Sequence, residues 1–184
     1  VYTGLAGVNS SFVITNKGQI YYWGKPFNSV EGRGSVFTRP AKLEKSSKTL
    51  EVLREKNLFE KIVFVKLVNY GYNYGAIDIK GRVFTFGENN TENLGFALKD
   101  TDFYPEEANL VGQVLDMICM DIALSEKNLF LILEKRDKKN ESWFVEGKIC
   151  REFIGASKNF TVEYLKDLKK MRTNFDIGIT AHHM

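Results

Sequence analysis

The 184-residue chain has few of the features that mark secreted, membrane-spanning or nucleic-acid-binding proteins. It contains two cysteines, Cys119 and Cys150, whereas a disulfide framework normally needs more, so a reducing intracellular compartment is expected. No apolar run approaches the roughly 18 residues of a membrane-spanning helix. The net charge of +3 is spread along the chain, so no direct nucleic-acid partner is predicted. The chain is rich in asparagine, which explains four chance glycosylation sequons, at Asn9, Asn89, Asn140 and Asn159.

Motifs of catalysis and ligand binding are equally scarce. Neither a Gly-x4-Gly-Lys-Ser/Thr phosphate loop nor a Gly-x-Gly-x-x-Gly fingerprint is present, so the glycines are assigned to turns. The two histidines, His182 and His183, are adjacent and have no third metal ligand in view. Cys119 lies among apolar residues and is interpreted as an inert core thiol. The sequence therefore predicts no catalytic residue, no cofactor and no metal site, and a protein that is not an enzyme.

A glycine frame that encloses an aromatic strand occurs three times. In the two best copies, Gly18 and Gly24 bracket Gln-Ile-Tyr-Tyr-Trp, and Gly81 and Gly87 bracket Arg-Val-Phe-Thr-Phe. The third copy lacks its first glycine and has the polar segment 136–141 in its place. The strand-ending glycines are 63 and then 60 residues apart, and each is followed by another glycine eight residues later, which indicates an internal repeat. The signature positions are Gly18, Trp23, Gly24, Gly32, Gly81, Phe86, Gly87, Gly95, Trp143, Gly147 and Gly155.

Each repeat unit is predicted to contain about four short antiparallel strands joined by glycine-rich turns. The units are placed at 1–60, 61–112 and 113–173, with the start of a fourth at 174–184. Strands are expected at 5–7, 12–15, 20–23 and 36–43, at 62–68, 76–79, 83–86 and 101–106, and at 114–119, 129–133, 142–147 and 160–165. A loop is expected at 148–154. Corresponding turn positions hold Ser10, Asn73, Asn128 and His183, so we interpret the sequence as a window from a longer array.

A charged insert at 44–60 interrupts the first unit. Ser46 or Ser47 would cap a short helix there, with Leu50 and Leu53 near helical spacing. A solvated connector is the preferred interpretation of this insert, and a docking helix is the alternative.

Stacking of the units determines the predicted fold. Four strands are too few to bury both faces of a sheet, and four-stranded units arranged in a ring form an all-β propeller. Propellers have about 4–8 blades, so the three visible here need further blades from the same chain or another. Packing between blades explains the recurring aromatic residues better than a ligand cage does. Residues 163–171 suit either a helix or an outer strand with its connector.

The best copies of the frame resemble the repeat of the regulator of chromosome condensation family. That repeat has a small-Gly-x-x-His turn, an apolar strand, an aromatic strand ending in Trp-Gly and a loop ending in Leu-Gly. Residues 6–24 match it best, 81–95 match nearly as well, and 143–147 are a degenerate copy. The turn histidine of the family is replaced here by Ser10, Asn73 and Asn128, and the Gly-Gln before Leu-Gly is replaced by Glu92-Asn93.

The resemblance implies a β-propeller of seven blades, about three of them visible here, and two kinds of function. One is guanine-nucleotide exchange on a small Ran-like GTPase, and the other is a rigid interaction platform within larger proteins. No exchange residue can be carried over, because those residues lie in loops that these copies do not match. We therefore expect an interaction scaffold whose inserts at 44–60, 96–104 and 135–142 contact other proteins, with nucleotide exchange as the alternative. The partner would be a subunit of a large assembly or a small GTPase; cytoplasm, cytoskeleton or cilium, organelle and nucleus all stay open as locations.

Overall fold

A computed structural model of the chain describes residues 2–27, 36–58, 61–96, 104–135, 148–153 and 160–164. Within these residues the chain forms three four-stranded antiparallel sheets, each with its strands in chain order. The first sheet consists of β1 (Thr3–Ala6), β2 (Ser10–Ile14), β3 (Ile20–Gly24) and β4 (Phe37–Lys42). The second consists of β5 (Phe64–Tyr70), β6 (Asn73–Asp78), β7 (Val83–Gly87) and β8 (Asn109–Leu110). The third consists of β9 (Met117–Leu124), β10 (Leu129–Lys135), β11 (Lys148–Phe153) and β12 (Phe160–Tyr164).

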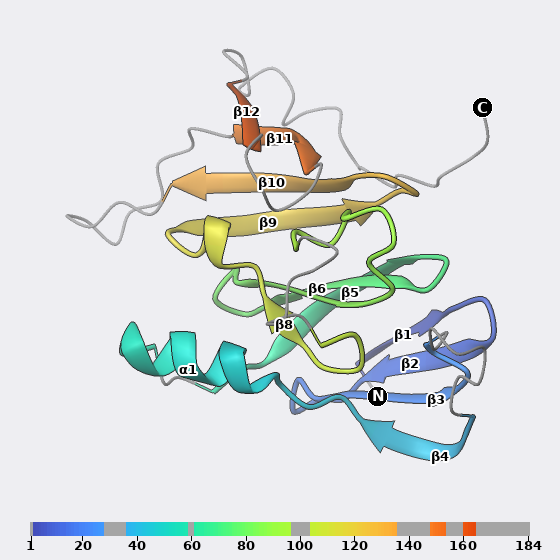
Figure 1. Cartoon of the computed structure of the whole chain (residues 1–184). Coiled ribbons are helices and arrows are strands. Elements are labelled where there is room, and N and C mark those ends of the chain that lie inside the picture. The colour runs from blue at the N-terminus through green and yellow to red at the C-terminus, as the bar shows by residue number, and fades with distance from the viewer. Residues whose placement is uncertain are drawn as a thin grey trace.

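The three sheets are stacked, with the second sheet between the other two (Figure 1). Strand β5 contacts β1 and β2, and β9 contacts β5 and β6, so the backbones of adjacent sheets come closest at their first two strands. The last strands, β4, β8 and β12, form the opposite edge of each sheet. This arrangement confirms the predicted all-β class and the four-stranded antiparallel units.

The pattern of burial along two strands shows how the sheets stack. Residues of β2 are alternately buried and half-buried, and Ser10, Phe12 and Ile14 are the buried ones, facing the second sheet. Strand β7, in contrast, is buried at every residue from Val83 to Gly87. A strand that has a neighbouring sheet on each face carries no solvent-exposed side, so it loses the alternation of polar and apolar residues.

The insert between the first and second sheets contains helix α1 (Ser47–Glu55), which docks on the second sheet. The Ser46 hydroxyl caps the helix by accepting a hydrogen bond from the Thr49 amide at 3.1 Å. The Thr49 hydroxyl in turn donates to the Ala108 carbonyl and accepts from the Leu110 amide. Leu53 is buried, whereas Leu50 is 49% exposed. The preferred connector interpretation was therefore wrong: a buried polar side chain and Leu53 fasten this helix to β8.

Two strand predictions also need correction. The outer strand of the second sheet is β8. Of the strand predicted at 101–106, residues 104–106 are described and are not in a strand, because Pro105 lies in a turn. The third strand of the third sheet is β11, where a loop had been predicted. The third aromatic segment, 142–147, lies outside the described residues, as do Gly32, Gly155 and the predicted fourth unit.

Candidate interaction face

The first glycines of the two complete frames, Gly18 and Gly81, lie where one sheet touches the next. Gly18 has φ +68° and Gly81 has φ +74°, a left-handed conformation that disfavours other residues. The Gly18 carbonyl accepts a hydrogen bond from the Phe64 amide at 2.9 Å, and the Gly81 carbonyl accepts one from the Cys119 amide at 2.8 Å. A Cβ atom on Gly18 would lie 2.7 Å from the Val63 Cα atom. These two signature glycines therefore allow direct backbone contact between successive sheets.

The second glycines of the first two frames, Gly24 and Gly87, lie at the opposite end of the strands. A Cβ atom on Gly24 would lie 2.5 Å from the Asn9 carbonyl oxygen, and one on Gly87 would collide with the Tyr72 carbonyl. The residue after each glycine donates its amide to the same carbonyl, at 2.8 Å for the first sheet and 3.0 Å for the second. These glycines let the loop that follows the third strand close against the turn between the first two strands.

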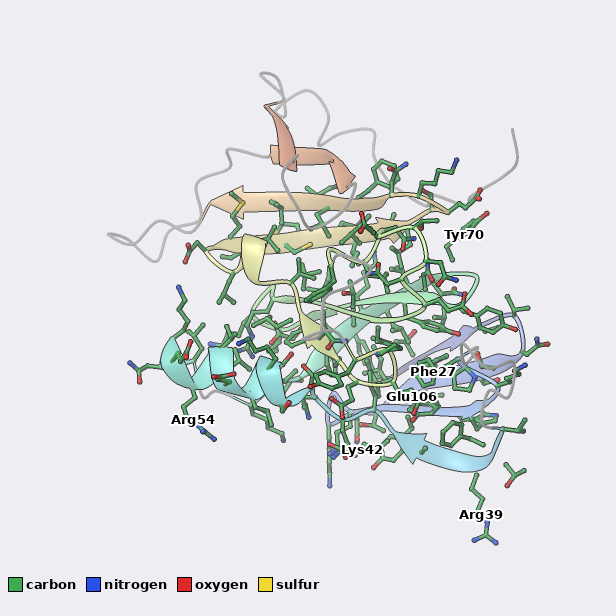
Figure 2. All side chains as sticks on the ribbon, viewed as in Figure 1. Phe27, Arg39, Lys42, Arg54, Tyr70 and Glu106 are labelled. Carbon is green, nitrogen blue, oxygen red and sulfur yellow. The ribbon has the colours of Figure 1, made fainter. Side chains whose placement is uncertain are left out.

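Turns and loops from all three sheets gather at this second end, which we call the loop face. It consists of residues 7–9, 25–27, 70–73, 88–96 and 125–128. Figure 1 shows these connections at one end of the stack, opposite α1, and Figure 2 shows Tyr70 at that end and Arg54 at the other.

Side-chain hydrogen bonds join the first and second sheets on the loop face. The Asn9 amide nitrogen donates to the Tyr72 hydroxyl at 3.0 Å. The Tyr74 hydroxyl donates to the Pro26 carbonyl at 3.0 Å and lies 3.2 Å from the Ser10 hydroxyl. Burial raises the pKa of Tyr74 to about 12, so the phenol keeps its donor proton well into the alkaline range.

A second set of hydrogen bonds continues the network into the third sheet. The Asn73 amide nitrogen donates to the Asn93 side-chain oxygen at 2.9 Å, and Asn93 donates to the Ser125 carbonyl at 3.1 Å. The Thr91 hydroxyl donates to the Glu126 carbonyl at 2.8 Å. Since Asn93 is fully buried, its hydrogen bonds hold the loop after β7 in one position. The three sheets thus present one connected surface rather than three separate loops.

The loop face exposes apolar groups on this fixed framework. Val8 is 62% exposed in the turn between β1 and β2, and Tyr70 is 41% exposed at the end of β5. Exposed charges of both signs, such as Glu126 and Lys127, accompany them. Apolar anchors surrounded by mixed polar groups are typical of protein-binding surfaces.

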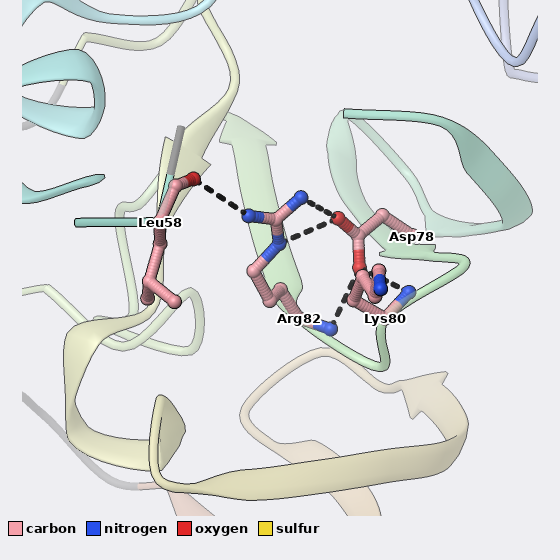
Figure 3. Close-up of polar contacts among 4 residues, drawn as sticks. All are labelled: Leu58, Asp78, Lys80 and Arg82. Atoms are coloured by element: carbon pink, nitrogen blue, oxygen red, sulfur yellow. Dashed lines mark hydrogen bonds and ion pairs between the residues drawn. The ribbon is translucent and has the colours of Figure 1, made fainter. Parts of the chain in front are cut away.

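At the opposite end, the second sheet is stabilised by charge rather than by an amide network. In the turn between β6 and β7, the Arg82 Nε atom donates to the Asp78 carboxylate at 2.6 Å, and both side chains are buried (Figure 3). The same carboxylate accepts from the Lys80 and Arg82 amides. In the equivalent turn of the first sheet, Thr15 and Gln19 make the corresponding backbone contacts without charge. This ion pair closes a hairpin, and its carboxylate is fully occupied by structural contacts.

Metal-ligating and thiol side chains are scattered over the described sheets. The described residues contain no group of three or more metal-ligating side chains. Cys119 is buried, and its thiol donates to the Asp121 carbonyl at 3.0 Å. None of the helices in the described ranges has the length and apolarity to cross a membrane.

The sequence predicts the turns of the loop face but not the side-chain hydrogen bonds that join them. Ser10 and Asn73 were recognised as equivalent turn positions, and each does begin the second strand of its sheet. The roles of Tyr72 and Asn93 were not predicted. The 63-residue spacing between Asn9 and Tyr72 was available as a signal, because equivalent turns of adjacent units lie next to each other in a stacked repeat. Among the signature positions, Trp23 is half-buried and Phe86 is fully buried.

Comparison with solved structures identifies the fold. No protein-family model and no curated protein sequence matches the chain. The structure of human WBSCR16 matches 76% of this chain at a TM-score of 0.50 and 16% identity. That of yeast RCC1 (Prp20) bound to Kap60 matches 77% at a TM-score of 0.50 and 20% identity. The chain covers 35% and 27% of those two proteins, respectively. The molecule therefore has the fold of RCC1-type β-propellers, and its three sheets are blades.

Proposed function

We propose that this chain is part of a β-propeller that serves as a protein-interaction scaffold, with no enzymatic activity of its own, and that it belongs to the regulator of chromosome condensation family. The proposed units are 1–60, 61–112 and 113–173, with the start of a fourth at 174–184. The observation that carries the proposal is the continuous loop face, on which all three blades are joined by buried or half-buried polar side chains.

A rigid loop face lowers the cost of binding a partner. A partner that binds flexible loops must order them, and each immobilised side chain costs about 0.5–1.5 kcal/mol of binding free energy. Here the Asn73–Asn93–Ser125 chain of hydrogen bonds holds the loops before any partner arrives. Exposed Val8 and Tyr70 then supply apolar anchors without further ordering cost to the backbone. The yeast RCC1 structure, solved in complex with Kap60, supports a protein partner for this kind of fold.

The experiment is an affinity capture with the immobilised 184-residue chain, read by mass spectrometry. The test variant combines Val8→Ser and Tyr70→Ala, and the matched control is Leu50→Ser, since Leu50 is 49% exposed on α1 at the other end. We expect the test variant to lose captured partners by about tenfold or more, as loss of an interface anchor does. Equal capture by both variants would contradict a role for the loop face.

The same capture separates the scaffold from the alternative, guanine-nucleotide exchange. Nucleotide is stripped with EDTA before binding, and GTP is then added to the column. A scaffold keeps its partners after this addition. A small GTPase that elutes with GTP would instead support nucleotide exchange, which the scaffold proposal does not predict.

A further inference from the structure

The turns between the second and third strands carry a lysine at the same position in the first two blades. Residues 15–18 and 78–81 form these equivalent turns, and in each the last residue, a glycine, donates its amide to the carbonyl three residues earlier, at 2.9 Å. Lys17 and Lys80 directly precede that glycine. Both lysines are exposed, so the repeat presents a positive charge at the same point of both blades.

A third exposed lysine, Lys61, belongs to the segment that leads into β5. This segment contacts both turns through its backbone. The Phe64 amide donates to the Gly18 carbonyl at 2.9 Å, and the Ile79 amide donates to the Val63 carbonyl at 2.8 Å. The three lysines therefore gather on one surface. We call it the turn face, and it consists of residues 15–18, 61–63 and 78–81.

The turn face is positively charged and lies at the opposite end of the strands from the loop face. Its one carboxylate, that of Asp78, is buried and paired with Arg82, so the exposed charges are those of the three lysines. Beside them, Ile79 is 63% exposed and adds an apolar group. In the third blade, Asp116 holds the position that corresponds to Lys61, so this positive surface belongs to the first two blades.

Blades added on either side would leave the turn face open. Blades pack through the faces of their sheets, whereas turns lie at the ends of the strands. The second blade shows this directly. It lies between the other two sheets, and its turn residues Ile79 and Lys80 are nevertheless exposed.

We propose that the turn face binds an acidic, extended segment of a partner protein. Stacked sheets are about 10 Å apart and an extended chain advances about 3.3 Å per residue, so carboxylates on every third residue match lysines that recur once per blade. Ile79 offers an apolar contact to the residues between them. A nucleic acid suits this surface less well, because the net charge of the chain is only +3. The turn face is separate from the loop face, and this proposal does not rest on the proposed function.

The test is fluorescence anisotropy with the 184-residue chain and a labelled peptide made of Glu-Leu-Ser repeats. The reversal variant combines Lys17→Glu and Lys61→Glu. Its matched control combines Lys25→Glu and Lys127→Glu, which make the same change of charge on the loop face. We expect wild type and control to bind with a Kd on the order of 10–100 µM, and the reversal variant to bind at least about tenfold more weakly. Binding should also weaken from about 0.1 to about 1 M salt, because salt screens exposed charges.

The competing results are distinct. Equal weakening in the reversal variant and its control would overturn the proposal, because the peptide would then respond to net charge alone. Equal binding of a peptide with glutamine in place of glutamate would overturn it, as would a wild type that leaves the peptide unbound at about 1 mM. Tighter binding of a single-stranded DNA with the same number of charges would assign the surface to nucleic acid instead.

A milder variant covers the case in which the charge reversal prevents folding, as judged by circular dichroism. Lys17→Gln and Lys61→Gln remove both charges without adding repulsion. This variant should bind the peptide about threefold more weakly than wild type, because each exposed ion pair contributes little. Unchanged binding by the folded glutamine variant would overturn the proposal.

Discussion

The two interfaces between blades have the same backbone design and different side chains. Between the first and second blades the core is aromatic, and it includes Phe12, Tyr22, Phe27, Tyr74, Phe84 and Phe86. Between the second and third blades it is aliphatic, and it includes Ile77, Val83, Leu94, Ile122, Leu129, Leu131 and Leu133. The aromatic interface buries a tyrosine hydroxyl with its partners, whereas an ion pair between Lys66 and Asp121 joins the aliphatic one at its rim.

The comparison separates what the repeat fixes from what it leaves variable. Both interfaces keep a left-handed glycine against the backbone of the next blade, and both keep its carbonyl-to-amide hydrogen bond. The side chains that fill the remaining space differ in size and chemistry. Many combinations of apolar side chains fill a given core volume, whereas a backbone contact without room for a Cβ atom accepts glycine alone.

The largest effect is expected from substitutions that disrupt the backbone contact shared by both interfaces. Replacement of Gly18 or Gly81 by alanine should destabilise the chain by about 3–5 kcal/mol, because left-handed strain adds to a collision with the next blade. The effect should be larger at Gly18, whose Cβ would lie 2.7 Å from the Val63 Cα atom, than at Gly81, where the nearest backbone atom, the Cys119 nitrogen, is 3.0 Å away. Urea denaturation followed by circular dichroism measures both.

A third glycine supplies the control for this comparison. Gly71 also has a positive φ, of +57°, but nothing lies within 4 Å of an added Cβ atom. Gly71→Ala should therefore cost only the conformational strain, about 1 kcal/mol. Equal losses at Gly71 and Gly18 would mean that strain alone, rather than contact between blades, explains why the first glycine recurs in the frame.

Core truncations sharpen the difference between the two interfaces. Phe86→Ala should cost about 4 kcal/mol, and Leu131→Ala about 3 kcal/mol, in the free energy of unfolding. The aromatic site loses more because the Phe86 ring is stacked on Tyr74 at 5.1 Å between centroids. Chemical denaturation gives both values. A larger loss at Leu131 would show that the aliphatic interface is the more tightly packed of the two.

Removal of one hydroxyl tests the polar component of the aromatic interface. Tyr74→Phe should cost about 1–3 kcal/mol, because the buried Pro26 carbonyl loses its donor. Burial raises the pKa of Tyr74 to about 12 in the folded protein, against about 10 in an unfolded chain.

The raised pKa adds a pH dependence with a definite sign. The folded protein holds the phenol proton more tightly than the unfolded chain does, so this contribution to stability is complete below pH about 10. It is lost as the pH rises from about 10 to about 12. In the Tyr74→Phe variant, the free energy of unfolding should fall less steeply over this pH range. The fall that remains is due to Tyr22, whose pKa is also raised by burial. An unchanged slope in the variant would show that Tyr74 does not titrate this way.

The sequence predicted the parts of the fold that depend on short-range pattern. The spacing of Gly18, Gly24, Gly81 and Gly87 located the third strands of two blades, because turns and close backbone contacts need glycine. The docking of α1 was missed, since its fastening through Thr49 depends on Ala108, which lies 59 residues later. Helical spacing alone does not say whether a short amphipathic segment finds a partner surface.

Different physical reasons explain the failures in the third blade and on the loop face. Strand β11 has the sequence Lys-Ile-Cys-Arg-Glu-Phe, whose mixed polarity favours a loop, yet it pairs with β10 and β12 on either side. Pairing with neighbours overrides local propensity in a sheet. The loop face escaped prediction for another reason. Single asparagines such as Asn93 suit any turn, and only the stacking of blades brings it to Asn73 and Ser125.

The smallest expected effect concerns the rim of the aliphatic interface. Lys66 on β5 pairs with Asp121 on β9, and their side chains are 42% and 28% exposed. A double-mutant cycle with Lys66→Met and Asp121→Asn should give a coupling of below about 1 kcal/mol, and it should shrink as salt is raised, because solvent screens such pairs. A coupling of several kcal/mol that is insensitive to salt would assign the cohesion of this interface to charge. A small coupling would assign the cohesion of this interface to the leucines of β10. The two interfaces then differ only in their buried cores.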